Sequence, residues 1–169
     1  KLNEEQVADT AASDEEAVLE NKIAEYDAFL TKQDPAFTVE ELEEAMQKVM
    51  DQYAGGIETH YQFNEKQLAM AEEKIKKLQI LAKGLAAADM HELMFIYELK
   101  ERLTVCLTVI AHLRARKETR WHSFAENLDY PEKSDAWLCY VNSKKNGDQI
   151  TMIRSCLLYT SPSPRDRQK

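Results

Sequence analysis

Apolar residues recur at helical spacing along the first part of the chain and predict four helices. We expect the first helix to begin at Ser13, whose hydroxyl can cap the acidic turn that follows it. This helix should end before Pro35. Its apolar stripe, which is typical of an amphipathic helix, consists of Val18, Ile23, Tyr26 and Leu30.

The second and third helices begin at residues that can cap a first turn. Thr38, followed three residues later by Glu41, forms a capping box, and the helix it opens should end at Gly55-Gly56. Asn64 is the expected cap of the third helix, and Gly84 is its expected C-terminal cap.

The fourth helix should run from about residue 90 to 118 and be the longest. Asp89, with Glu92 three residues later, repeats the capping signal. Between residues 103 and 113 the helix is apolar almost all round, which is typical of the central helix of a bundle. We therefore expect it to form the core.

Beyond Trp121 the helical periodicity fades and a β-hairpin is predicted. Residues 137–141 have the composition of a strand, Asn146-Gly147-Asp148 is a hairpin turn, and residues 150–153 supply a second strand. The predicted fold class is mainly α, a bundle of three to four helices with a small C-terminal β-hairpin.

We expect three regions. Residues 1–37 form an N-terminal helix and linker, and residues 38–155 form a helical domain that ends in the hairpin. Residues 156–169 differ abruptly in composition, and residues 156–166 resemble a translation of the transposase-end adapter used in tagmentation sequencing. We expect this tail to be non-native and disordered; the alternative is a native Ser/Pro-rich tail. Because the chain also lacks an initiator Met, we expect a fragment.

Charge and composition exclude several classes of protein. The net charge of −8 argues against nucleic-acid binding, which requires a basic surface. No apolar run approaches the roughly 20 residues that cross a bilayer, so we expect no membrane insertion. Three cysteines without a CxxC pair fit a reducing cytoplasm.

Compact catalytic signatures are missing from the sequence. It contains no GxGxxG, P-loop, HExxH or GxSxG motif. No histidine has Glu three residues before it, as a di-iron bundle would require. We therefore assign no catalytic, cofactor-binding or metal-binding residue.

Basic residues gather where the fourth helix should end: Arg114, Arg116, Lys117 and Arg120. The favoured interpretation is structural, because cations stabilise the negative end of a helix dipole. In the alternative, Arg120 lies beside Trp121 and His122 and faces an anionic partner across an interface. The candidate interface residues are Arg116, Glu118, Arg120, Trp121 and His122.

Several segments resemble one flavoprotein superfamily. They are Asp51-Gln52-Tyr53-Ala54-Gly55-Gly56, Met90-His91-Glu92-Leu93-Met94, and Glu118-Thr119-Arg120-Trp121 followed by Asp129-Tyr130-Pro131 and Trp137. In order and spacing they are similar to the C-terminal helical region of the fumarate reductase and succinate dehydrogenase flavoproteins. The resemblance is strongest to the adenylylsulfate reductase alpha subunits, because Trp121 stands where fumarate reductases carry Gly.

The resemblance implies a parent oxidoreductase that binds FAD upstream of this chain and reduces adenylylsulfate to sulfite and AMP. It also implies a ferredoxin-like iron–sulfur beta subunit as the electron-donating partner. In that setting this segment serves packing and interfaces and is not itself catalytic. The alternatives are a fragment of a fumarate reductase or succinate dehydrogenase-like flavoprotein, or an independent helical interaction module.

Overall fold

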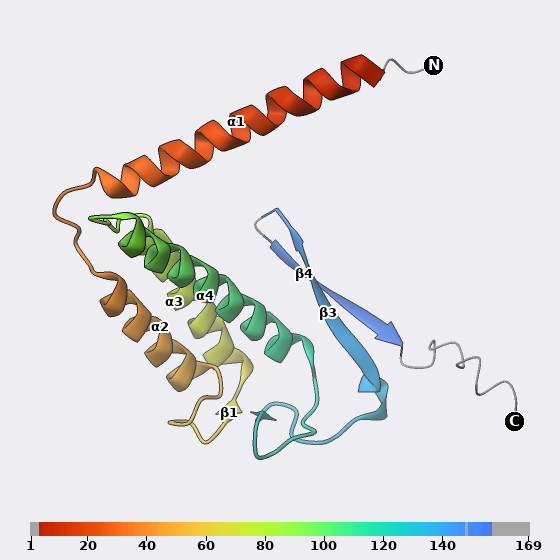
Figure 1. The fold of residues 1–169 in the computed structure, drawn as a ribbon. Coiled ribbons are helices and arrows are strands. Elements are labelled where there is room, and N and C mark those ends of the chain that lie inside the picture. The colour runs from red at the N-terminus through yellow and green to blue at the C-terminus, as the bar shows by residue number, and fades with distance from the viewer. Residues whose placement is uncertain (1–3, 148, 157–169) are drawn as a thin grey trace, which may run out of the picture.

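The computed structural model describes residues 4–147 and 149–156, and the side chains of residues 15–147 and 149–155. The described chain is mainly helical, with two small two-stranded sheets (Figure 1). The predicted fold class, a helical bundle with a C-terminal β-hairpin, is confirmed. No helix in the described ranges is long and apolar enough to cross a membrane.

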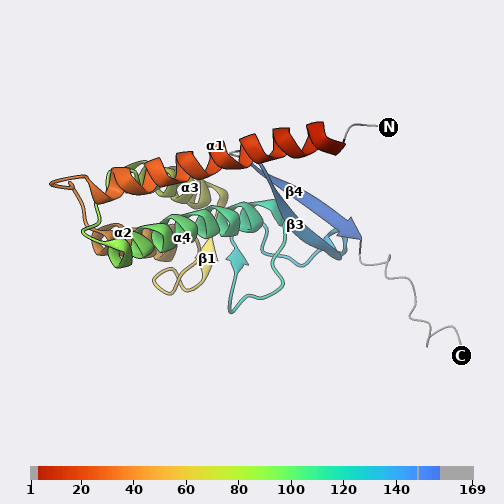
Figure 2. The same cartoon turned by 45° about the horizontal axis from the view of Figure 1, so that its top comes forward.

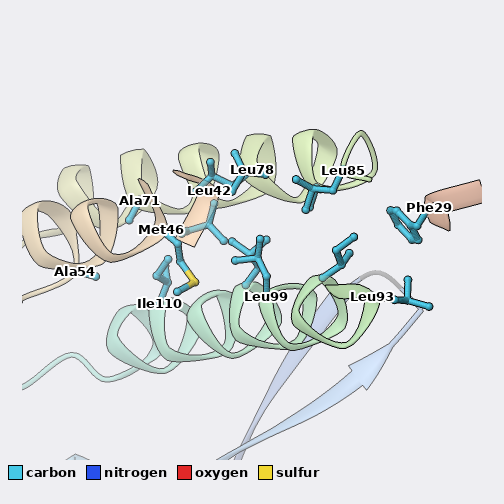
Figure 3. Close-up of a cluster of buried hydrophobic side chains, with 14 of the residues drawn as sticks. Phe29, Leu42, Met46, Ala54, Ala71, Leu78, Leu85, Leu93, Leu99 and Ile110 are labelled. Carbon is cyan, nitrogen blue, oxygen red and sulfur yellow. The ribbon is translucent and has the colours of Figure 1, made fainter. Parts of the chain in front are cut away.

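Helices α2 (Val39–Tyr53), α3 (Glu65–Ala82) and α4 (Met90–Ala115) pack side by side and enclose the core (Figures 1 and 3). Each helix turns its apolar stripe inward, so the buried side chains of the three interdigitate. The largest of the fully buried apolar side chains are Leu68, Ile75, Leu85, Ile96, Leu99, Leu103 and Ile110.

The predicted N-terminal caps of these three helices are confirmed, whereas the C-cap of α3 is Lys83 and not the predicted Gly84. The backbone N–H of Glu41 donates to Thr38 Oγ1 at 3.2 Å, and the Thr38 N–H donates to Glu41 Oε2 at 2.9 Å. Asn64 Oδ1 accepts from the Gln67 N–H at 2.9 Å. Asp89 Oδ1 accepts from the N–H groups of His91 and Glu92, both at 2.9 Å. Local sequence therefore fixes where α2, α3 and α4 begin.

Helix α1 (Glu4–Leu30) begins earlier than Ser13, so the predicted start is wrong. The residues before Ser13 are rich in Glu and Ala, which favour a helix strongly enough to carry it through the candidate cap. The helix does end before Pro35, as predicted. With 27 residues against 26, α1 is also longer than α4, which corrects the prediction that the fourth helix is the longest.

Only the C-terminal end of α1 packs on the bundle, and its remainder extends past it (Figures 1 and 2). Phe29 is buried, whereas Val18 and Ile23 of the predicted apolar stripe are exposed. Tyr26 and Phe29 meet the Tyr97 ring of α4 edge to face, at centroid distances of 5.2 and 6.3 Å. The apolar stripe of α1 is thus covered for only part of its length.

Helix α4 ends at Ala115 and not at residue 118. Arg116 is already extended (φ −88°, ψ 111°), and Thr119 is bonded to the following loop. The prediction of a central helix holds for one side only. Leu103 and Ile110 are buried, but Val105 and Val109 remain 60% and 41% exposed.

The β-hairpin is formed by β3 (Cys139–Asn146) and β4 (Gln149–Cys156), paired antiparallel from Cys139↔Cys156 to Asn146↔Gln149. Gly147 in the turn has φ +61°, as the predicted tight turn requires; Asp148 lies outside the described residues. Trp137 does not belong to the strand, because it ends a short 3-10 helix, η1 (Asp135–Trp137). Of the predicted non-native tail, Cys156 forms the end of β4, and residues 157–169 lie outside the described residues.

A second, very short sheet was not predicted. Strand β1 (Gln62–Phe63) pairs in parallel with β2 (Glu126–Asn127). Gln62 is aligned with Glu126 and Phe63 with Asn127, and the partners in each pair are 64 positions apart in the sequence. This pairing joins the loop before α3 to the loop after α4. It places the loop before α3 beside the segment that carries the five candidate interface residues.

Candidate functional site

Glu118 is the centre of a charged cluster just beyond the end of α4. Its side chain has no solvent exposure. Its carboxylate accepts from Arg116 Nη1 at 2.6 Å, from Arg120 Nε and, at 2.9 Å, from the Ser134 backbone N–H. The two flanking arginines therefore compensate one buried negative charge and hold it in a fixed geometry.

The pKa of Glu118 reflects two opposing influences. Burial raises the pKa of this carboxyl, because a charge is less stable away from water. The hydrogen bonds from Arg120, the Ser134 N–H and Arg116 together outweigh burial, so the pKa of Glu118 lies below its ordinary value. Glu118 is therefore ionised at neutral pH and is not a candidate general acid.

The two arginines of the cluster also bind backbone carbonyls of the next segment. Arg116 donates to Trp137 O at 3.1 Å and to Cys139 O at 3.0 Å. Arg120 donates to Ser134 O at 3.0 Å. Arg116, Glu118 and Arg120 therefore form one internal clamp that fixes the entry to the β-hairpin.

Thr119 and Asn127 form a second bonded pair beside this clamp, and neither was predicted from the sequence as a candidate site residue. Thr119 Oγ1 accepts from the Asn127 N–H at 3.0 Å and donates to Tyr130 O at 2.9 Å. Both residues are buried, at 1% and 4% exposure. Buried polar groups are normally bonded in this way. The spacing of Glu118-Thr119-Arg120-Trp121 to Asp129-Tyr130-Pro131 was the available signal.

The other two candidate interface residues face solvent. Trp121 is 69% exposed, and His122 Nδ1 lies 3.3 Å from Glu126 Oε1. Phe124, in the same turn, is 72% exposed, and its ring lies 6.5 Å from that of Tyr61. The structure thus divides the five predicted residues into a clamp of three, with Glu118 buried between two half-buried arginines, and an exposed turn of two.

The neighbouring Asp51–Gly56 motif fixes the loop that carries Tyr61. Asp51 Oδ1 accepts from the Glu58 N–H at 3.1 Å. Gly56 lies so close to Asp51 that an added Cβ would be 2.4 Å from the Asp51 Cα. Only glycine fits such a close backbone approach. His60 and Tyr61 then adopt positive φ values of 53° and 64°, which costs about 1–3 kcal/mol per residue.

The remaining basic residues of the predicted cluster pair with α3. Arg114, in the last turn of α4, contacts Glu65 at 2.7 Å and also Glu72. Lys117 contacts Glu65 at 3.2 Å. The location of Arg114 agrees with the structural interpretation based on the helix dipole.

A groove of about 900 Å³ lies between α1, α3, α4 and the β-hairpin. Its lining mixes apolar side chains with lysines and one carboxylate, including Glu25, Phe29, Ile80, Lys83, Lys100 and Ile150. Lys100 is paired with Glu25. Over the described residues, no group of three His, Cys, Asp or Glu side chains could hold a metal ion.

The turn from β1 into α3 does not fit a dinucleotide cofactor. Flavin and nicotinamide dinucleotides are held by a glycine-rich turn between a parallel strand and a helix. Here Asn64 alone separates the strand from the helix, and its side chain caps α3. No glycine lies between Gln62 and Gln67.

The sequence matches the model of one known protein family. The model of the family described as fumarate reductase flavoprotein C-term matches residues 43–168, which include most of α2, all of α3 and α4, and the clamp. The chain belongs to this family. The match also runs into residues 156–169, whose adapter origin stays a prediction.

Relatives within the family include sulfur-metabolising reductases. The adenylylsulfate reductase subunit alpha of Megalodesulfovibrio gigas is 33% identical over 98 residues, which are 57% of this chain and 15% of that protein. The adenylylsulfate reductase structure from Archaeoglobus fulgidus superposes with a TM-score of 0.77 at 32% identity, over 83% of this chain and 24% of that chain. This chain therefore spans a minor part of the length of its relatives.

Two further structures superpose on the chain. An adenosine-5-phosphosulfate reductase in complex with sulfite, as a covalent adduct, has a TM-score of 0.70 at 34% identity, over 79% of this chain and 22% of that chain. An E. coli quinol fumarate reductase has a TM-score of 0.67 over 97% of this chain and 27% of that chain, but only 21% identity, so it supports the fold alone.

Proposed function

We propose that this chain is part of the C-terminal helical domain of an adenylylsulfate reductase alpha subunit. The observation that carries the proposal is the graded similarity within the family. Identity is 32–34% to the adenylylsulfate reductases but 21% to the fumarate reductase. The whole protein would then reduce adenylylsulfate to sulfite and AMP.

In this proposal the chain supports the flavoprotein and does not carry out its chemistry. The clamp of Arg116, Glu118 and Arg120 supplies an internally satisfied brace. Its charged groups are all bonded to partners within the chain. Its role is therefore to hold the hairpin and the exposed turn at Trp121 in position.

FAD and an iron–sulfur beta subunit are the proposed cofactor and partner of the whole protein. The family is one of flavoproteins, and the M. gigas relative is named as one subunit, alpha. FAD would bind in the part of the flavoprotein that lies outside this chain, because this sequence holds no glycine-rich dinucleotide motif. The cysteine pattern supports a cytoplasmic location.

The alternative is a flavoprotein that reduces fumarate or oxidises succinate. It is supported by the description of the matching family, fumarate reductase flavoprotein C-term. The two proposals differ in the substrate of the whole protein and not in the role of this chain.

The test compares the full-length flavoprotein with the isolated chain. We expect the full-length protein to bind FAD stoichiometrically and, with a reduced viologen as electron donor, to release sulfite and AMP from adenylylsulfate. The isolated chain should give a helical circular-dichroism spectrum without flavin absorbance. Fumarate reduction without adenylylsulfate turnover would favour the alternative. Tight FAD binding by the isolated chain would overturn the supporting role.

A further inference from the structure

Four exposed apolar side chains gather at the end of the bundle where β1 meets β2. This aromatic edge consists of Ile57, Tyr61, Trp121 and Phe124. Their exposed fractions are 73%, 38%, 69% and 72%. They come from two loops more than fifty positions apart in sequence, which the β1–β2 pairing joins. The rings of Tyr61 and Phe124 lie 6.5 Å apart across these loops. Large apolar side chains exposed close together on a surface usually mark a contact with another folded part.

The backbone beneath the aromatic edge is fixed. The N–H groups of Phe124 and Ala125 both donate to Trp121 O at 2.9 Å. The Glu126 N–H donates to Tyr61 O at 3.0 Å and thereby joins the two loops. Tyr61 is held at positive φ by the Asp51–Gly56 loop. Trp121 and Phe124 are therefore presented outward on a preorganised turn, at little further entropic cost for docking.

The charged side chains of the second loop beside the aromatic edge are paired within the chain. Glu126 accepts from Gln62 at 2.9 Å and contacts His122 at 3.3 Å. Glu118, Arg116 and Arg120 are turned inward. Apart from the exposed Glu58 and His60 of the first loop, the edge therefore offers an apolar surface. Such a composition is typical of permanent interfaces, which are more apolar than transient ones.

We propose that the aromatic edge packs against the remaining, larger part of the flavoprotein polypeptide. This inference rests on the proposed function, in which the chain is part of a longer flavoprotein. Its relatives are several times longer, since the chain covers 15–24% of the adenylylsulfate reductase chains it matches. All four residues of the edge fall within the range matched by the family. A neighbour within the same polypeptide is permanent, and permanent interfaces are the more apolar ones. The iron–sulfur subunit is the competing occupant that the footprint below distinguishes.

Hydroxyl-radical footprinting of the full-length flavoprotein tests the proposal without reference to its substrate. The oxidation rates of Trp121 and Phe124 are measured against their intrinsic reactivities, first in the flavoprotein alone and then with the iron–sulfur subunit. We expect about tenfold protection or more in the flavoprotein alone, close to that of buried Phe29. In the isolated chain both should react near their intrinsic rates while Phe29 stays protected.

Two results would overturn the proposal. One is oxidation of Trp121 and Phe124 at near-intrinsic rates in the flavoprotein alone. The other is protection that appears only when the iron–sulfur subunit is added, which would assign the edge to that subunit. Because no turnover is measured, a flavoprotein that reduces fumarate instead of adenylylsulfate still gives a valid footprint.

A pair of variants gives an independent readout. Trp121→Ser combined with Phe124→Ser should leave the Tm of the isolated chain nearly unchanged, because both side chains are exposed there. In the full-length flavoprotein it should speed proteolysis between this domain and the remainder by about tenfold. Tyr140→Ser is the matched control, an aromatic residue that is 58% exposed on β3. If Tyr140→Ser speeds proteolysis as much as the double variant does, the result would contradict packing of the aromatic edge against the rest of the polypeptide.

Discussion

Glu118 combines full side-chain burial with a negative charge, and two guanidinium groups compensate that charge. An isolated carboxylate at this position would be protonated or expelled, because burial raises the pKa of a carboxyl. Arg116 and Arg120 reverse the direction of the shift and leave the pKa lowered. The clamp is therefore a single unit, in which removal of one member leaves the others without partners.

Replacing Glu118 tests the clamp. We expect Glu118→Gln to lower the free energy of unfolding by about 3 kcal/mol, because it leaves two partly buried guanidiniums without a counter-charge. Urea denaturation at pH 7, followed by circular dichroism, measures the loss. Glu44→Gln is the control, since the Glu44–Lys48 pair is about two-thirds exposed on both sides and should contribute little. Equal midpoints for the two variants would contradict a structural role for the clamp.

At the scale of elements, α1 is held to the bundle by few contacts, and Glu25 is central among them. Its carboxylate pairs with Lys100 of α4 and, at 2.7 Å, with Lys22 of α1 itself. The hydrogen bonds from Lys100 and Lys22 lower the pKa of Glu25 from 4.5 to about 2. Tyr26 and Phe29 pack beside this pair against Tyr97. The tether therefore depends on the ionised form of one carboxyl.

The lowered pKa of Glu25 predicts a pH dependence of stability. In the unfolded chain this carboxyl titrates near 4.5, so its contribution is complete above that pH and is lost as the pH falls towards about 2. We expect Glu25→Gln to reduce the loss of stability over this window, as measured by urea unfolding at a series of pH values. Glu73→Gln, which affects an exposed pair within α3, should alter the curve less. If the free energy of unfolding of Glu25→Gln falls with decreasing pH as steeply as that of the unchanged chain, Glu25 does not contribute to the acid sensitivity.

At the scale of the whole molecule, α4 is covered on one side and bare on the other. Val105 and Val109 lie opposite the buried Leu103 and Ile110, and their exposed fractions are 60% and 41%. A helix that is apolar all round is normally buried all round. The outer face of α4 is therefore a second surface, besides the aromatic edge, that favours association of the isolated chain.

Charging this outer face should improve the behaviour of the isolated chain. We expect Val105→Lys combined with Val109→Lys to reduce concentration-dependent association in analytical ultracentrifugation, with little change in Tm, because both side chains are exposed. Leu103→Lys, at a fully buried position of the same helix, should instead unfold the chain. Association that persists unchanged in the double variant would assign it to another surface.

Much of the fold follows from local sequence. The caps at Thr38, Asn64 and Asp89 act within one turn, so the sequence alone locates the starts of α2, α3 and α4. The turn at Gly147 is equally local, because it depends on one positive φ. The start of α1 was missed at Ser13, where helix propensity on both sides overrides a possible cap.

The candidate site depended on contacts between distant segments. The sequence grouped Arg116, Glu118 and Arg120, but their spacing alone did not reveal that they bond to one another and to the hairpin entry. The β1–β2 pair is too short to give a periodic signal, and it forms only because α3 and α4 bring its strands together. Local hydrogen bonds therefore set the helices, whereas burial and long-range pairing decided which charges turn inward and which aromatic side chains remain outside.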